Sequence, residues 1–186
     1  MMLLPDHCSR RVVAGALAVS FLPVYSSDCK AEDSPKTPPK TPLTNLENGL
    51  RVLVINEGQG DRPEDGAKVE INYKARLAAK QGWQFDNTYS NTDRFGEPIP
   101  FKFEVGDPGV IVGLSEAVRL MRVGGTIRVV IPTYLGYQDR TQAPIPREFS
   151  NRQRLYSTIF NPTRLANGEG DTLGILIFDI DLLAIR

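Results

Sequence analysis

The sequence of 186 residues has few of the side chains on which most enzymes rely for chemistry. It contains one histidine, His7, and two cysteines, Cys8 and Cys29, all near the N-terminus. If that segment is removed, the remaining chain can form no histidine-based triad, no cysteine nucleophile, no Cys/His zinc site and no disulfide. We therefore expect no metal or organic cofactor and no hydrolase chemistry.

The sequence also lacks an excess of charge, because 22 lysines and arginines stand against 22 aspartates and glutamates. Nucleic-acid-binding domains gather a basic excess on one face, so we expect no nucleic-acid partner. A dinucleotide fingerprint is missing too, since Gly106, Gly109 and Gly113 have the wrong spacing. What remains is aromatic, carboxylate, amide and backbone groups in a chain long enough for one ordinary domain and a tail.

An export signal is predicted over residues 1–31. Arg10 and Arg11 precede an uncharged, mostly apolar run at residues 12–22. A transmembrane helix needs about 20 residues, so this run predicts no stable membrane span in the mature protein. The arginine pair resembles a twin-arginine signal, which directs folded proteins to export. A tail or buried helix with a chance arginine pair is the alternative.

A proline-rich linker is predicted over residues 32–47. Four prolines fall within eight residues, and each fixes φ and withholds a backbone donor. This composition favours an extended spacer, with a ligand for an SH3-like partner as the alternative. The prolines are Pro35, Pro38, Pro39 and Pro42.

The remaining chain, residues 48–186, reads as an α+β domain. Apolar and polar residues alternate with period two in several segments, which indicates a sheet with one solvent-exposed face. The expected strands cover residues 50–55, 69–74, 101–105, 126–131 and 173–185. Leu114, Ala117, Val118 and Met121 have helical spacing, which predicts one short helix ended by two glycines. We expect a curved antiparallel sheet that wraps this helix.

Two long loops separate these elements, at residues 86–98 and 147–171. The second is longer than loops in compact domains usually are, so we expect it to be functional or to carry local structure. It contains arginines and aromatic residues, a combination that RNA-binding surfaces share. Glu148, Glu169 and Asp171 offset three of those charges, which again argues against nucleic acid.

Seven short motifs, in order and mostly with the right spacing, resemble the FKBP family of peptidyl-prolyl cis–trans isomerases, which bind the macrolide FK506. The resemblance covers about residues 48–186 and implies the same α+β fold, with a flap insertion at about 147–171. The motifs are 66–73 (GAKVEINY), 82–86 (GWQFD), 100–106 (PFKFEVG) continued by Val110, Ile111 and Gly113, 121–125 (MRVGG), 131–137 (IPTYLGY), 145–146 (IP) and 178–183 (FDIDLL).

The resemblance also implies a substrate pocket. A lone aromatic residue in a strand is usually a core residue, but the pocket of this family is an open end of its core. Leu114 takes the position of the pocket floor, where the family usually has tryptophan. The pocket residues implied by the motifs are Tyr73, Phe85, Asp86, Phe101, Val110, Ile111, Tyr137, Ile145 and Phe178.

Such a pocket can catalyse rotation about an Xaa-Pro bond without a base or a nucleophile. The barrier of roughly 18–20 kcal/mol comes from amide resonance, and a twisted amide is less dipolar than a planar one. An apolar cleft therefore disfavours the planar ground state more than the transition state. The Tyr137 hydroxyl and the Ile111 N–H would hold substrate carbonyls, and Asp86 would polarise the site. We expect Phe85→Ala and Asp86→Ala to lower activity and leave the fold nearly intact.

Three departures from the family pattern leave a second function open. These are Leu114 at the floor, the long loop after Asp86, and the insertion after Pro146, with Gln138 where the family has glycine. The first hypothesis is an active isomerase that acts on proline-containing client proteins. The second is an FKBP-like chaperone or assembly factor, with a weak or inactive pocket, that binds one client through its flap insertion.

The flap insertion together with the arginine pair resembles the FKBPs of the chloroplast thylakoid lumen. This resemblance implies a lumenal protein, for which a photosynthetic-complex subunit is one candidate client, and we expect a monomer. A plastid protein would also need a transit peptide ahead of Arg10, where only nine residues stand. Either the N-terminus of the sequence is incomplete, or the protein is bacterial and is exported to the periplasm.

Overall fold

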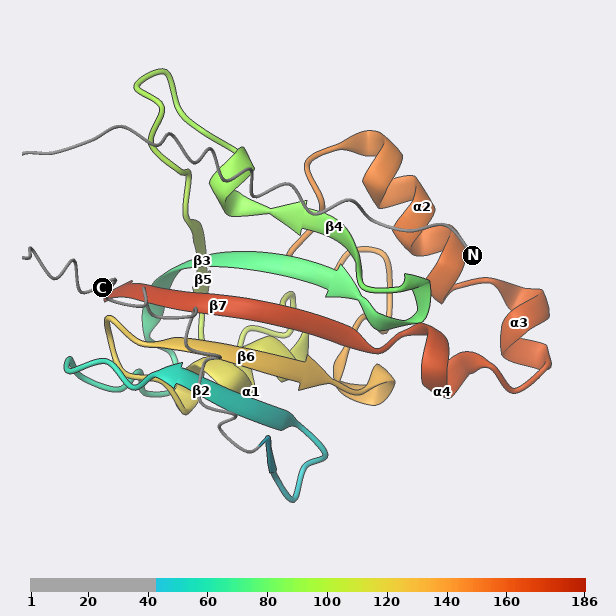
Figure 1. Cartoon of the computed structure of the whole chain (residues 1–186), viewed down its shortest axis with the longest axis horizontal. Coiled ribbons are helices and arrows are strands. Elements are labelled where there is room, and N and C mark those ends of the chain that lie inside the picture. The colour runs from blue at the N-terminus through green and yellow to red at the C-terminus, as the bar shows by residue number, and fades with distance from the viewer. Residues whose placement is uncertain (1–42) are drawn as a thin grey trace, which may run out of the picture. The chain divides into compact units, whose positions relative to one another are not determined.

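The computed structural model describes residues 43–186, so the predicted export signal and most of the predicted linker lie outside the described residues. Within them, seven strands form one antiparallel sheet in the order β1-β2-β6-β7-β3-β4, with β5 also paired to β3 (Figure 1). The strands are β1 (Thr44–Asn45), β2 (Arg51–Asn56), β3 (Lys68–Leu77), β4 (Trp83–Asn87), β5 (Phe101–Glu104), β6 (Thr126–Ile131) and β7 (Leu176–Ile185).

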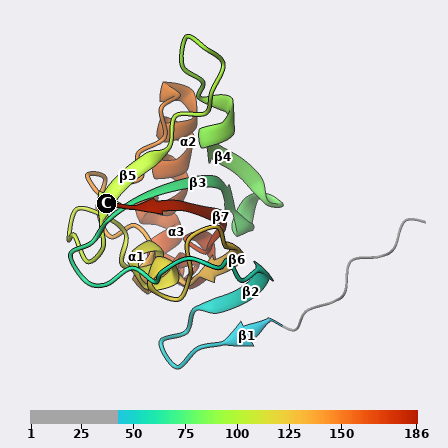
Figure 2. The same cartoon turned by 90° about the vertical axis from the view of Figure 1, so that its left-hand side faces the viewer.

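Helix α1 (Val112–Arg119) packs against one face of the curved sheet (Figure 2). Leu114, Ala117 and Val118 are fully buried on its inner side, as their spacing predicts. Met121 is also buried, but it lies beyond the helix and its N–H bonds the carbonyl of Val118 at 3.0 Å. The α+β fold with a short helix wrapped by an antiparallel sheet is thus confirmed.

The segment 147–171 is not a structureless loop, and the prediction of a single helix misses it. It contains α2 (Phe149–Ile159), α3 (Pro162–Ala166) and the start of α4 (Gly170–Leu173). Asn161 caps α3 by accepting the N–H groups of Thr163 and Arg164, and Pro162 follows at the first helical position. Figure 1 shows all three helices at the end of the sheet where β7 begins.

The pairing of β3 creates a gap at one edge of the sheet. On one side β3 pairs with β7, from Val69 to Leu77. On the other side β5 pairs with residues 68–71 and β4 with residues 74–77, which leaves Tyr73 between them. Thr88 fills this gap, because its Oγ1 accepts the Tyr73 N–H at 2.9 Å and its O–H donates to the Tyr73 carbonyl at 3.2 Å.

The folded region begins before residue 48. Thr44 and Asn45, which composition assigns to the linker, pair with Val52 and Arg51. At the other end of β2, Gly58 has a φ of +69°, and a Cβ there would lie 2.5 Å from the Gly125 nitrogen. Glycine is therefore required where this turn crosses residues 122–125.

Candidate active site

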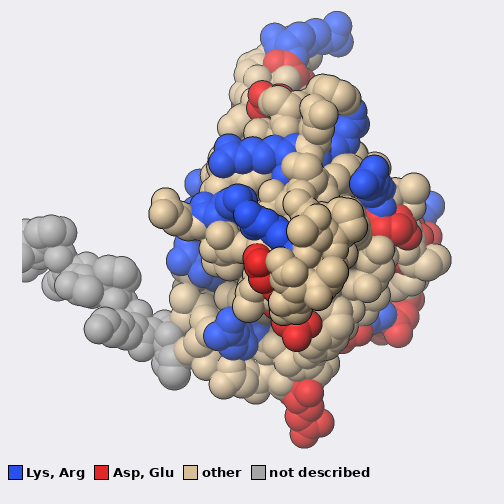
Figure 3. Space-filling view, turned by 90° about the vertical axis from the view of Figure 1, so that its right-hand side faces the viewer, with Lys and Arg blue, Asp and Glu red and all other residues tan. Residues whose placement is uncertain are grey.

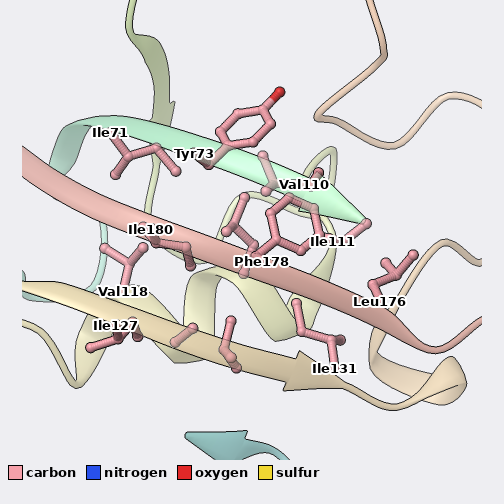
Figure 4. Packing of buried hydrophobic residues seen from close by; sticks show 14 of the residues in the cluster. Ile71, Tyr73, Val110, Ile111, Val118, Ile127, Ile131, Leu176, Phe178 and Ile180 are labelled. Carbon is pink, nitrogen blue, oxygen red and sulfur yellow. The ribbon is translucent and has the colours of Figure 1, made fainter. Parts of the chain in front are cut away.

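Four aromatic rings from separate parts of the chain meet at one end of the core. Phe178 on β7 lies between the others, with ring centroids 5.5 Å from Tyr73 on β3 and 6.1 Å from Phe85 on β4. Phe85 in turn lies 6.4 Å from Tyr137, in the loop after β6. Offset and edge-to-face contacts at these distances are favourable between aromatic rings. Figure 4 shows Val110 and Ile111 beside Phe178 in this cluster.

Asp86 is the carboxylate of the site. Its Oδ2 accepts the Tyr73 O–H at 2.6 Å, and its Oδ1 accepts the backbone N–H of Asn87 at 3.0 Å. Burial, reinforced by the nearby charge of Asp86, raises the pKa of the Tyr73 phenol far above its ordinary value. Tyr73 therefore keeps its proton and acts as a hydrogen-bond donor that fixes the orientation of Asp86. The Phe101 ring packs edge-on against the Tyr73 ring, with the ring centroids 5.9 Å apart.

The two donors expected to hold a substrate both bind the protein's own chain. The Ile111 N–H donates to the carbonyl of Ala143 at 2.9 Å, and the Tyr137 O–H donates to the carbonyl of Pro144. Burial raises the pKa of Tyr137 well above its ordinary value, so its hydroxyl keeps its proton. Pro144 itself is buried.

The sequence-predicted residues are brought together, but the site is closed. Asp86 and Phe101 are partly buried, and Ile145 differs from expectation because 41% of it is exposed. Burial alternates along the extended segment that contains it, with Pro144 and Pro146 inside and Ile145 outside. Seven of the predicted residues expose 3% or less of their surface: Tyr73, Phe85, Val110, Ile111, Leu114, Tyr137 and Phe178.

Helix α2 forms a wall beside this cluster. The ring of Tyr156 lies 6.4 Å from that of Tyr137, and its O–H donates to the Arg140 carbonyl at 3.0 Å. The Arg154 guanidinium stacks 4.3 Å from the centre of the Trp83 ring. Sequence reasoning assigned no role to Pro144, Tyr156 or Trp83. Trp83 lies within a family motif, but nothing in the sequence indicates that an insertion helix would pack beside it.

Comparison with known proteins identifies the family. The family model for FKBP-type peptidyl-prolyl cis-trans isomerases matches residues 60–183. The chain belongs to this family. Peptidyl-prolyl cis-trans isomerase FKBP17-1, chloroplastic, from Arabidopsis thaliana is 49% identical over 177 residues, which cover 95% of this FKBP and 76% of the relative. FKBP16-1, chloroplastic, from the same plant is 34% identical over 151 residues, which cover 81% of this FKBP and 64% of the relative.

The fold comparison agrees. The crystal structure of FkpA from Escherichia coli superposes with a TM-score of 0.53 at 28% identity, over 77% of this FKBP and 51% of the FkpA chain. Among the described residues, no cluster of three or more His, Cys, Asp or Glu side chains could hold a metal ion. In the same part of this FKBP, no helix combines the length and apolar character that a membrane span requires.

Proposed function

We propose that this FKBP catalyses cis–trans isomerisation of Xaa-Pro bonds in client proteins at the site around Phe178. The observation that carries the proposal is the cluster of Tyr73, Phe85, Tyr137 and Phe178 beside a single carboxylate, Asp86. This site has an apolar wall and a fixed polar group, but no nucleophile. Bond rotation needs no proton transfer, so the reaction matches the groups available.

In the open site, the substrate proline would lie among Phe85, Val110 and Phe178, above Leu114. The Ile111 N–H and the Tyr137 O–H would hold the flanking carbonyls. Asp86, held by Tyr73, would oppose the charge separation of the planar amide. The apolar surroundings would act in the same direction, because they stabilise the twisted amide relative to the polarised ground state.

The test is NMR exchange spectroscopy of the peptide Ala-Ala-Pro-Phe with the full chain, which needs no auxiliary protease. We expect the chain to accelerate cis–trans exchange and Asp86→Asn to reduce the acceleration about tenfold, because the amide keeps the size of the carboxylate but loses the charge that acts on the amide dipole. Asp93→Asn is the matched control, since Asp93 accepts backbone N–H groups in an exposed turn. Equal activity of wild type and Asp86→Asn would contradict the role of Asp86.

The location that we propose is the thylakoid lumen, with lumenal proteins as clients. Two findings support it: Arg10-Arg11 ahead of the apolar run 12–22, and 49% identity to a relative named as chloroplastic. Isolated thylakoids should take up the full chain into a protease-protected form, and Arg10→Lys with Arg11→Lys should abolish the uptake. Uptake that ignores the arginines would contradict a twin-arginine signal.

A second candidate function is a client-binding module, which the closed site favours. A groove of about 310 Å³ lies beside α2. Figure 3 shows the side of the molecule that lies on the right of Figure 1, where basic side chains are prominent. The groove is lined by Arg140, Phe149, Arg152, Gln153, Tyr156 and Ser157. Its occupant would be an acidic client segment with an apolar side chain against Phe149, which is 66% exposed. A folded chain without isomerase activity would favour this function.

A further inference from the structure

We propose that the flap segment, residues 138–146, occupies the isomerase site of its own chain and that a client proline must displace it. The inference rests on the proposed function, because it concerns the same pocket. It assigns to Ala143-Pro144 the role of an internal competitor. The site would therefore alternate between a self-bound and an open state.

The flap segment already uses both donors that a substrate would need. A substrate carbonyl needs the Ile111 N–H, which here donates to Ala143 at 2.9 Å, and a second carbonyl needs the Tyr137 O–H, which here donates to Pro144. Neither donor can serve both a client and the flap segment with good geometry. A client and the flap segment therefore cannot bind these two donors at the same time.

The flap segment also resembles a client in its chemical groups. Ala143-Pro144 is an Xaa-Pro unit, the same unit that an isomerase accepts from its clients. The carbonyls before and after its proline nitrogen are both hydrogen-bonded, and Pro144 is buried. The segment therefore supplies the same kinds of group as a client: two carbonyl acceptors and an apolar ring.

The flap segment is also held in place by contacts away from the two donors, one of them within the segment itself. The Ala143 N–H donates to the Gly109 carbonyl at 2.7 Å, and the Gln142 Oε1 accepts the Gln138 N–H at 2.6 Å. The Tyr156 O–H of α2 bonds the Arg140 carbonyl. Tyr156 of the insertion thus ties down the flap segment at Arg140, and the internal Gln142–Gln138 bond maintains its conformation. Gln142 can therefore be changed without altering a pocket residue.

A closed state lowers the apparent affinity in proportion to the open fraction, and a change that favours opening restores it. We expect Gln142→Ala and Pro144→Gly, made separately in the full chain, to raise kcat/KM for Ala-Ala-Pro-Phe about three- to tenfold. The gain should come from a lower KM with kcat little changed. Gln59→Ala, at an exposed turn position, and Pro162→Gly, at an exposed position of the insertion, are the matched controls and should change neither constant.

The outcomes separate the two proposals. If neither wild type nor the released variants accelerate exchange, the proposed isomerase function fails. If wild type is active and both released variants are no faster, self-occupation is overturned. Hydrogen exchange at the Ile111 amide gives a readout without activity: it should be protected in wild type and exchange faster in Gln142→Ala. An Ile111 amide that exchanges freely in wild type would also overturn the proposal.

Discussion

Phe85 is a core residue as well as a candidate pocket residue. Only 1% of it is exposed, and its ring contacts those of Trp83, Tyr137 and Phe178. The expectation that Phe85→Ala leaves the fold nearly intact came from an open pocket, and it does not fit this burial. Activity lost in Phe85→Ala would therefore not distinguish catalysis from stability.

We expect Phe85→Ala to lower the free energy of unfolding by about 3–5 kcal/mol, because it removes a buried ring and leaves a cavity. Phe85→Leu should cost about 1.5 kcal/mol or less, since it keeps most of the apolar volume. Urea unfolding of the full chain measures both. A Phe85→Ala midpoint equal to that of wild type would show that this end of the core is open in solution.

Sequence reasoning could locate the ring cluster through the family resemblance, because Tyr73, Phe85 and Phe178 fall in motifs that resemble those of the FKBP family. It could not predict closure of the site or the outward position of Ile145. Both depend on hydrogen bonds to the backbone carbonyls of Ala143 and Pro144. Backbone acceptors are the same in every residue, so such contacts leave no pattern in the sequence.

Helix α2 is a whole element that the sequence pattern did not predict. It buries Leu155 and Ile159, four residues apart, but most of its other residues are polar. Two apolar positions in one short segment give too weak a period to separate a helix from a loop. The length of the segment was the better signal, because long loops in compact domains usually carry structure or function.

If α2 belongs to the core, its buried side chain should contribute to global stability. We expect Leu155→Ala, at a residue with no exposed surface, to lower the free energy of unfolding by about 2–5 kcal/mol. Leu165→Ala on α3, at a residue 47% exposed, should cost about 0.5 kcal/mol or less. Urea unfolding compares the two. Equal, small effects would mean that the insertion unfolds separately from the sheet.

In the described residues most ionised groups reach the surface, and Glu70, which is buried, pairs with Lys102 and Arg186, whereas the phenols buried near the site are neutral. Asp179 pairs with Arg76 and Arg128 along the exposed side of the sheet. Tyr73 and Tyr137 are buried, and burial raises the pKa of each phenol. In the described residues this arrangement places the strongest coupling between protonation and folding in the alkaline range, above the pH at which an isomerase would be assayed.

The direction of that coupling follows from the raised pKa values. Both phenols stay protonated in the folded protein, whereas in the unfolded chain tyrosine loses its proton near pH 10. The unfolded state therefore binds fewer protons above that pH, and stability falls as the pH rises. At pH 11 each buried phenol should lower the free energy of unfolding by about 1.4 kcal/mol relative to pH 8.

Tyr73→Phe should remove the loss of stability that is due to one of these phenols, and urea unfolding at pH 8 and pH 11 measures it. Tyr134→Phe, at a residue 63% exposed, is the matched control. An identical pH 8 to pH 11 loss in wild type and Tyr73→Phe would show that the Tyr73 phenol is accessible to solvent, and hence that the closed site opens readily.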